Sequence, residues 1–145
     1  MANPTQQSLE TLRNQAHPYC IGCSGKNESG LALEFHLRDD GGVEAEFECN
    51  RAYQGYSGFL HGGIASLLLD SAMANCLFAR QITAVTARLI VRYLFPVKIH
   101  QPAIAKAWIR EYEPPLFVLE AELIQGGKAV VRASAKFIDL DYSVS

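Results

Sequence analysis

The sequence has 145 residues, of which 49% are hydrophobic and 19% charged, and its formal net charge is −2. This composition is typical of a folded globular protein and excludes a disordered chain. We expect one domain over residues 1–145. No hydrophobic run reaches the ~18 residues of a membrane span, and the N-terminus lacks the hydrophobic segment of a secretory signal. We therefore expect a cytoplasmic protein with no membrane partner.

The charges are unevenly distributed along the chain. Residues 1–79 carry nine acidic and four basic side chains, whereas residues 80–136 carry nine basic and four acidic ones. A basic second half suits a ligand with phosphate groups, although solvated strand faces would give the same composition. The sequence contains no basic run and no interleaved aromatic residues, so we expect no nucleic-acid partner.

The N-terminal segment combines a short helix with three potential metal ligands. Residues 5–16 predict the helix, which ends before the proline that follows His17. His17, Cys20 and Cys23 lie within seven residues of one another. Structural zinc requires four ligands, and this segment supplies three. We therefore predict a packed loop without metal, and a metal site remains the alternative. We interpret residues 1–30 as an N-terminal extension of the domain.

The remaining chain alternates between strand-like and helix-like patterns. Hydrophobic alternation predicts a strand over residues 31–38, and the DDGG sequence at 39–42 predicts a turn into a strand over 43–49. Residues 62–80 predict a helix that is hydrophobic around most of its surface and therefore buried. Four further strands are predicted, over residues 83–95, 103–112, 116–125 and 128–140. This order predicts an α+β fold, an antiparallel sheet of about six strands wrapped around one central helix.

The start of the buried helix carries the candidate chemistry. His61, Gly62 and Gly63 open it, and paired glycines let another group approach the backbone closely. The first-turn amides lack intrahelical partners and lie at the positive end of the helix dipole, so the Gly62 amide is a candidate oxyanion donor. Eight residues later, Asp70 interrupts a hydrophobic run, where a carboxylate requires a partner or a function. The pattern leaves a catalytic and a structural role for Asp70 open.

Helix geometry separates Gly62 from Asp70 within one chain. Eight helical residues span about 12 Å along the axis and leave about 80° around it. The amide that polarises a carbonyl and the group that attacks it must both lie within a few ångströms of the carbonyl carbon. If both groups act on one substrate, Asp70 of one chain meets Gly62 of another across a two-fold interface.

The His61-Gly62-Gly63 motif, Asp70 and the sequence RYLFP at residues 92–96 resemble the phenylacetate-type (PaaI-like) branch of the hotdog-fold thioesterase superfamily. The resemblance covers about residues 30–140. It implies an acyl-coenzyme A thioesterase that needs no cofactor and forms a homodimer or a dimer of dimers, with the active site at the subunit interface.

The resemblance also implies roles for particular residues. The Gly62 amide would bind the thioester oxygen, Asp70 would be the nucleophile or general base, and Thr86 would position the attacking water. His61 would orient the substrate carbonyl or Asp70. The residues predicted to bind substrate are Gly63, Gln54, Arg88 and Arg92. The arginines are expected to share a strand face with Thr86 and to reach coenzyme A phosphates. Gln54 would replace an asparagine that some relatives have where this chain has Gly55.

Three alternatives differ in what they require. Hydratases of similar fold carry a histidine that is followed by a proline-rich turn. This sequence has no proline between Pro18 and Pro96. A non-catalytic acyl-coenzyme A binder would keep the glycines but would not need Asp70. A zinc or redox module would depend on Cys20 and Cys23. The sequence does not define the acyl group.

Overall fold

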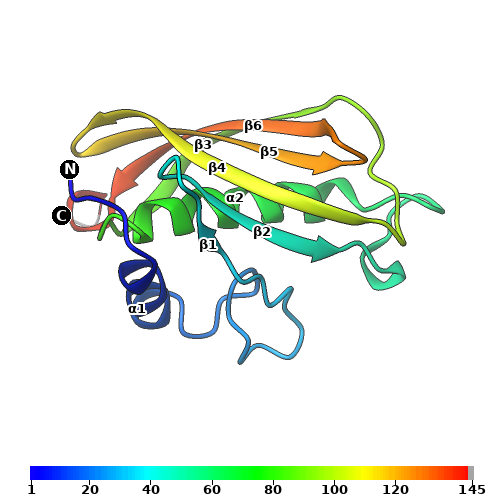
Figure 1. The fold of residues 1–145 in the computed structure, drawn as a ribbon, viewed down its shortest axis with the longest axis horizontal. Coiled ribbons are helices and arrows are strands. Elements are labelled where there is room, and N and C mark those ends of the chain that lie inside the picture. Colours follow the sequence, from blue (N-terminus) through cyan, green and yellow to red (C-terminus); the bar gives the residue numbers. More distant parts are fainter. Residues whose placement is uncertain (144–145) are drawn as a thin grey trace.

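The computed structural model describes residues 1–143. Six antiparallel strands form one sheet in the order β1-β2-β4-β5-β6-β3, which curves around helix α2 (Figure 1). The predicted α+β fold is therefore confirmed. The strands are His36–Leu37 (β1), Val43–Glu48 (β2), Ala84–Tyr93 (β3), Pro102–Glu113 (β4), Leu116–Gln125 (β5) and Lys128–Asp139 (β6). The helices are Gln6–Ala16 (α1), Gly62–Phe78 (α2) and Leu140–Ser143 (α3), with a 3-10 turn at Arg51–Tyr53 (η1).

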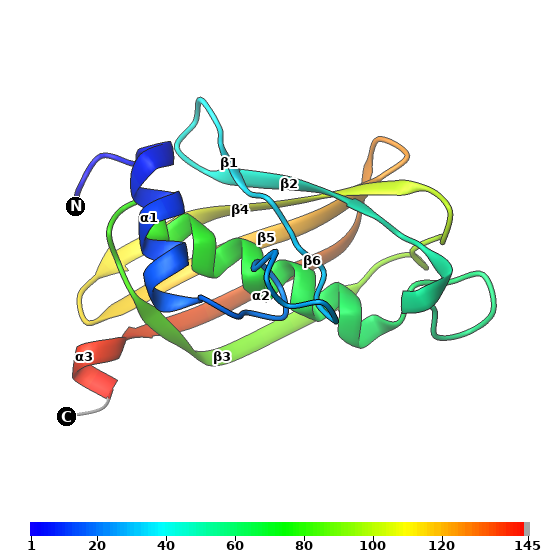
Figure 2. The same cartoon turned by 90° about the horizontal axis from the view of Figure 1, so that it is seen from below.

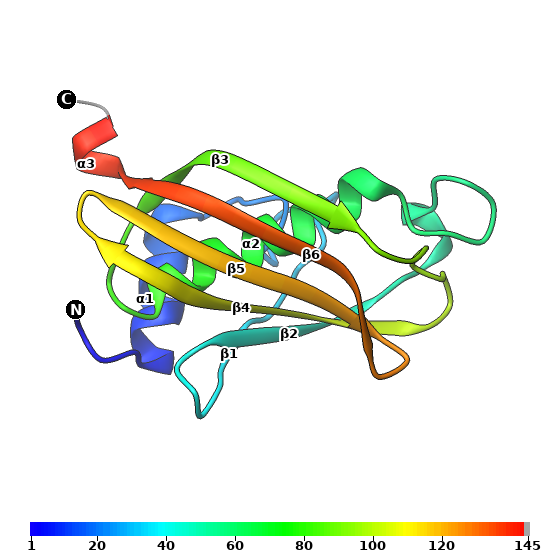
Figure 3. The same ribbon diagram turned by 90° about the horizontal axis from the view of Figure 1, so that it is seen from above.

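Helix α2 forms the centre of the hydrophobic core. Its hydrophobic side chains surround most of the helix, so it is stable only when it is covered on several sides. Leu68, Met73 and Leu77 are completely buried. The sheet covers one side of α2, as Figure 3 shows, and α1 and residues 17–35 cross the opposite side (Figure 2).

The inner face of the sheet is hydrophobic by strict alternation. The buried residues of β5 include Phe117, Leu119, Ala121 and Leu123, and the residues between them are only partly buried. The turn between β5 and β6 is formed by Gly126 and Gly127 with φ of 61° and 78°. Positive φ at both residues is the conformation that a two-residue hairpin turn requires. Its geometry keeps the inner residues of both strands directed at α2.

Strand β3 lies at one edge of the sheet. Among the strands of residues 1–143 it pairs only with β6, so its other edge has no strand beside it. Val85, Ile90 and Tyr93 on this strand are 42%, 42% and 54% exposed. A long edge strand with exposed hydrophobic side chains is suited to pairing with another chain.

The strand predicted over residues 31–38 is mostly wrong. Only His36 and Leu37 pair with β2, because the preceding backbone bonds elsewhere. The amides of Leu31 and Leu33 donate to the carbonyls of Ile21 and Gly22 at 2.8 and 3.0 Å. Leu33 is nevertheless almost fully buried. The alternation therefore reported which side chains enter the core, but not the segment with which the backbone pairs.

Helix α1 confirms the helix predicted over residues 5–16. Thr5 caps it by accepting the amide of Ser8 at 3.0 Å. Gln6 ties α1 to the edge of the sheet, since its side chain bonds to the Phe35 carbonyl and the Leu37 amide at 3.1 and 2.7 Å. None of the helices between residues 1 and 143 has the length and hydrophobicity to cross a bilayer.

Candidate active site

The first turn of α2 leaves one amide unpaired. His61 accepts the Gly63 amide on Nδ1 at 2.8 Å, and the Ile64 and Ala65 amides donate to the His61 carbonyl at 3.0 and 3.1 Å. Within residues 1–143 the Gly62 amide donates to no other group. An unpaired amide at the positive end of a 17-residue helix provides a donor for a developing negative charge.

A surface hollow lies at the start of α2. The hollow is lined by Gly55, Tyr56, Leu60, His61 and Gly62. Because His61 Nδ1 accepts a hydrogen bond, the neutral ring carries its proton on Nε2, where it can donate to a bound group. The hollow therefore offers a backbone donor and an imidazole within one turn of chain.

Tyr93 holds this end of α2 against β3. Its hydroxyl donates to the Gly62 carbonyl at 2.8 Å and lies 2.7 Å from the Ser66 hydroxyl. A Cβ on Gly62 would lie 3.4 Å from the Tyr93 ring, in ordinary van der Waals contact, so the ring packs directly against this end of the helix. Sequence reasoning used Tyr93 only as part of the RYLFP motif. Its contact with Gly62, 31 residues away, has no signal in a local pattern.

Asp70 and Thr86 form a direct pair between α2 and β3. The Thr86 hydroxyl donates to Asp70 Oδ1 at 2.6 Å, a length typical of a hydroxyl bonded to a carboxylate. Asp70 is half-buried and Thr86 is exposed at the sheet edge. No partner for Asp70 Oδ2 is present among residues 1–143. Thr86 therefore fixes one carboxylate oxygen and leaves the other available for chemistry.

The expectation that Arg88 and Arg92 share a face with Thr86 is wrong. Thr86 lies opposite Phe137, which is buried, but Arg88 lies opposite Lys136, which is exposed. A β-bulge between Thr86 and Arg88 inserts one residue and reverses the alternation. Both arginines consequently lie on the outer face of the sheet, away from the face that carries Thr86.

The loop before α2 places the remaining predicted residues. Gln54 Oε1 accepts the Gly58 amide at 3.0 Å, so the carbonyl end of this side chain closes the loop. A Cβ on Gly55 would lie 3.1 Å from the His61 Cα. The glycine thus makes room for His61, which is a physical reason for the absence of an asparagine at this position.

The two candidate catalytic groups occupy separate places on one chain. Gly62 and Asp70 both belong to the continuous helix α2, eight residues apart. Their separation along the helix is therefore about 12 Å. The hollow at Gly62 is not lined by Asp70 or Thr86. Each chain therefore carries two halves of a candidate site that do not face each other. We call the Gly62 amide with His61 the amide half, and Asp70 with Thr86 the carboxylate half.

His17, Cys20 and Cys23 converge beside α2. One nitrogen or sulfur atom from each lies within 4.8 Å of the others. Burial raises the pKa of Cys23 to about 12. Burial also lowers the pKa of His17, and the Asp70 carboxylate partly opposes that shift. Within residues 1–143 these three side chains form the group that could hold a metal ion.

The sheet wrapped around α2 defines a hotdog-fold protein. The model of the thioesterase superfamily matches residues 57–132, more than half of the chain. The chain therefore belongs to the thioesterase superfamily and is a thioester hydrolase. The matched segment contains Gly62, Asp70 and Thr86 but not the His17 cluster. A search of curated proteins gave no match.

Solved structures show the same fold at low sequence identity. A thioesterase superfamily protein aligns with a TM-score of 0.79 and 21% identity over 83% of this chain. This chain spans 60% of that protein's length. A hypothetical thioesterase from Streptococcus pneumoniae, solved with coenzyme A, has a TM-score of 0.70 and 19% identity over 74% of this chain and 88% of its own. A variant of the phenylacetic acid degradation protein PaaI from Thermus thermophilus has a TM-score of 0.69 and 24% identity over 76% of this chain and 95% of its own.

Proposed function

We propose that the protein is an acyl-coenzyme A thioesterase whose active site is shared by two copies of the chain. The observation that carries this proposal is the placement of the unpaired Gly62 amide and the Asp70–Thr86 pair eight residues apart on one helix. Membership of the thioesterase superfamily supports the reaction, and the coenzyme A bound to the S. pneumoniae protein supports the substrate class.

In the proposed reaction the Gly62 amide binds the thioester oxygen, which becomes negative as the carbonyl carbon turns tetrahedral. Asp70 either accepts a proton from the attacking water or attacks the carbon itself through Oδ2. Thr86 holds Oδ1 and so limits the orientations of the carboxylate. With water as the nucleophile, collapse of the tetrahedral intermediate breaks the C–S bond, and the coenzyme A thiolate takes up the proton held by Asp70 as the carboxylic acid leaves. With Asp70 as the nucleophile, collapse releases the thiolate and leaves a mixed anhydride on Asp70, which water then hydrolyses to the carboxylic acid.

Dimerisation through β3 would bring the two halves together. Two edge strands that pair antiparallel about a two-fold axis place the start of one beside the end of the other. Thr86, near the start of β3, holds Asp70, and Tyr93, at its end, holds Gly62. The same pairing would therefore put Asp70 of one chain near Gly62 of its partner. It would also cover the exposed hydrophobic side chains of β3.

The substrate-binding assignments belong to the same proposal. His61 and Gly63 would contact the acyl thioester at the start of α2, beside Gln54 of the preceding loop. Arg88 and Arg92 lie on the outer face of β3, so they would meet phosphates only if coenzyme A leaves the site across the sheet edge. A hydrolysis screen with aryl, short and long acyl-coenzyme A substrates would define the acyl group.

Subunit mixing tests the shared site. Gly62→Val places a branched side chain between the Tyr93 ring and the amide, where it should block the approach of the thioester carbonyl, and Asp70→Asn removes the carboxylate. When the two inactive chains exchange subunits, half of the dimers are mixed and each regains one intact site. We expect about a quarter of wild-type activity if the two substitutions act independently.

The control is a mixture of two differently tagged Asp70→Asn chains, which should stay inactive. If native mass spectrometry finds mixed dimers but activity stays at the level of the parent variants, the shared site is wrong.

A further inference from the structure

A cluster of three metal-ligating side chains lies outside the part of the chain that matches the thioesterase family. His17 follows α1, and Cys20 and Cys23 lie in the loop that crosses α2 on the side away from the sheet (Figure 2). We call these three residues the N-terminal cluster. The proposed thioesterase mechanism uses none of them.

The donor atoms of the N-terminal cluster have nearly the spacing of a metal site. The atoms lie within 4.8 Å of one another, and His17 Nδ1 is 3.4 Å from Cys23 Sγ. Around a tetrahedral zinc ion, the Zn–S and Zn–N bond lengths place two sulfurs about 3.8 Å apart and a sulfur and a nitrogen about 3.5 Å apart. Small rotations of side chains already in place would therefore form three zinc bonds.

The loop backbone supports the two cysteines. The Gly22 amide donates to Cys20 Sγ at 3.2 Å, a contact that stabilises a thiolate and orients its remaining lone pairs. The Ser24 amide donates to the Cys20 carbonyl at 3.1 Å and closes the turn. A Cβ on Gly22 would overlap the Ser71 hydroxyl, so the glycine lets the loop lie directly on α2.

A buried amide beside Cys23 supplies a second, independent observation. Asn75 of α2 is completely buried, and its side-chain nitrogen donates to the Ser71 carbonyl at 2.8 Å. The same side chain lies near Cys23 and partly offsets the burial that raises the pKa of that thiol. Its Oδ1 has no hydrogen-bond partner within the described part of the chain. A buried oxygen without a partner is costly unless a ligand or water satisfies it. This oxygen lies on the residue that contacts the cluster from α2.

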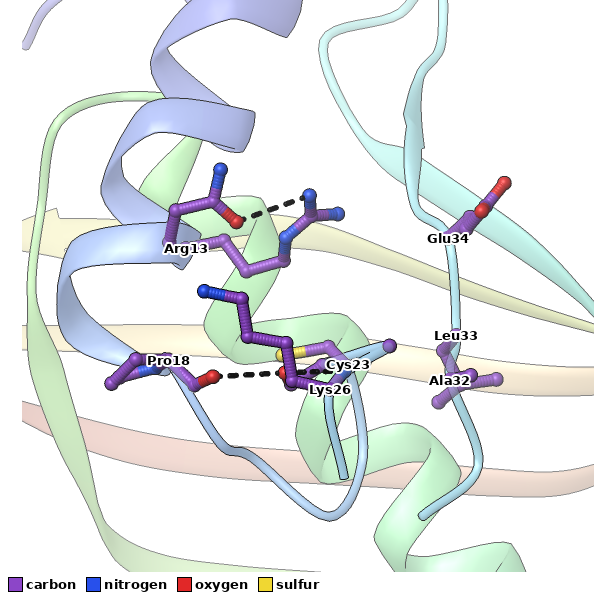
Figure 4. Close-up of a pocket in the computed structure, with 10 residues that line it drawn as sticks. Arg13, Pro18, Cys23, Lys26, Ala32, Leu33 and Glu34 are labelled. Atoms are coloured by element: carbon purple, nitrogen blue, oxygen red, sulfur yellow. Dashed lines mark hydrogen bonds between the residues drawn. The ribbon is translucent and has the colours of Figure 1, made fainter. Parts of the chain in front are cut away.

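An open hollow leads to the cluster from the surface. Figure 4 shows Cys23 at its centre, between Arg13 of α1 and the segment that carries Glu34. Lys26 also lines the hollow. Of the N-terminal cluster, Cys23 lines this hollow, so a metal ion could approach the cluster from the Cys23 side.

We propose that His17 Nδ1, Cys20 Sγ and Cys23 Sγ bind one zinc ion, with an oxygen atom, from Asn75 or from a water molecule beside it, as the fourth ligand. A set of one imidazole and two thiolates suits zinc, whereas iron–sulfur clusters require more cysteines. Binding releases one proton from each thiol, so the two thiolates balance the charge of the ion. A neutral centre adds little field at Asp70, and its function is to fix the N-terminal segment on α2.

The test uses the full chain, purified with a thiol reductant and freed of metal with a chelator. We expect one zinc ion per chain after titration with zinc chloride and dialysis, measured by elemental mass spectrometry. We also expect two fewer thiols to react with a thiol reagent and a higher Tm, because zinc binds the folded chain. Cobalt(II) in place of zinc should give the visible absorption of tetrahedral thiolate coordination.

Variants locate the site. Cys20→Ser changes a half-exposed residue and should lower zinc affinity about a hundredfold or more while the fold is kept, and His17→Ala should do the same. Cys49→Ala is the matched control, since Cys49 is buried beside Gln125 of β5, outside the N-terminal cluster, and should leave one zinc ion bound. The proposal is overturned if the reduced wild-type chain retains no zinc, or if Cys20→Ser binds zinc as tightly as the wild type.

Discussion

At the start of α2 the group that we propose to take part in the reaction is a backbone amide, whereas about two turns further along it is a side-chain carboxylate. The Gly62 amide stays unpaired because an amide in the first turn has no intrahelical acceptor, and the side-chain acceptor beside it, His61 Nδ1, is taken by the Gly63 amide. The carboxylate of Asp70 is held by a single hydroxyl from Thr86. Only a substitution by proline would remove the backbone N–H of Gly62. The contribution of this amide is therefore tested by changing the residues that position the start of α2. The carboxylate half can be removed outright.

The largest effect is expected from Asp70→Asn. The amide has the shape of the carboxylate but can neither accept a proton from water nor attack a carbonyl, so kcat should fall at least about a hundredfold. Steady-state kinetics measures the loss, with Asp39→Asn in an exposed turn as the control. Comparable turnover by purified Asp70→Asn would remove Asp70 from the mechanism.

Thr86→Ala should cost about tenfold to a hundredfold in kcat, because water can partly replace one positioning hydrogen bond. Thr86→Ser keeps the hydroxyl and should recover most of the rate. Rescue by serine separates the hydrogen bond to Asp70 from a general effect on β3. A wild-type rate in Thr86→Ala would mean that Thr86 is only a strand residue.

Gly55→Asn tests the supports of the amide half. The new side chain would push on the backbone of His61, so kcat/KM should fall about tenfold through loss of the transition-state contacts at the start of α2. Gly58→Asn in the same loop is the matched control, since a Cβ at Gly58 meets nothing within 4 Å and asparagine accepts its positive φ of 86°. Equal activities of the two variants would contradict a role for His61 placement.

The smallest effect is expected from Tyr93→Phe. It removes the hydroxyl from the Gly62 carbonyl and from Ser66 but keeps the ring, so the free energy of unfolding should fall by about 1 kcal/mol and kcat about two- to tenfold. Urea unfolding and kinetics measure both. Tyr19→Phe is the control, because Tyr19 is 64% exposed and lies outside the hollow at Gly62. If Tyr93→Phe and Tyr19→Phe behave alike, Tyr93 does not support the amide.

Much of this fold could be predicted from the sequence because hydrophobic periodicity directly reports which faces are buried. The helix from Gly62 and the four strands after it lie where the pattern placed them. The segment before β1 is the exception. There the side chains of Leu33 and Phe35 are buried as predicted, but the backbone of residues 31–33 bonds to the cysteine loop instead of to a strand. Periodicity describes side chains and does not choose between hydrogen-bond partners.

The candidate site divides in the same way. Gly62 and Asp70 could be selected from the sequence because the properties that matter there, paired glycines at a helix start and a carboxylate in a hydrophobic run, are local. The position of Arg88 could not be predicted. A one-residue bulge in β3 moves Arg88 to the outer face of the sheet. The pattern of hydrophobic and polar residues over 84–93 does not predict this bulge.

The sequence by itself therefore determined the buried helix, the inner faces of the strands and the order of reactive groups along α2, because these follow from residue type and spacing. Only the tertiary structure decided that Thr86 reaches Asp70 from sixteen residues away and that the Gly62 amide remains unpaired. It also brought His17, Cys20 and Cys23 together beside Asn75. Each of these outcomes depends on how hydrogen-bonding groups from distant segments compete for partners once the sheet has closed around the helix.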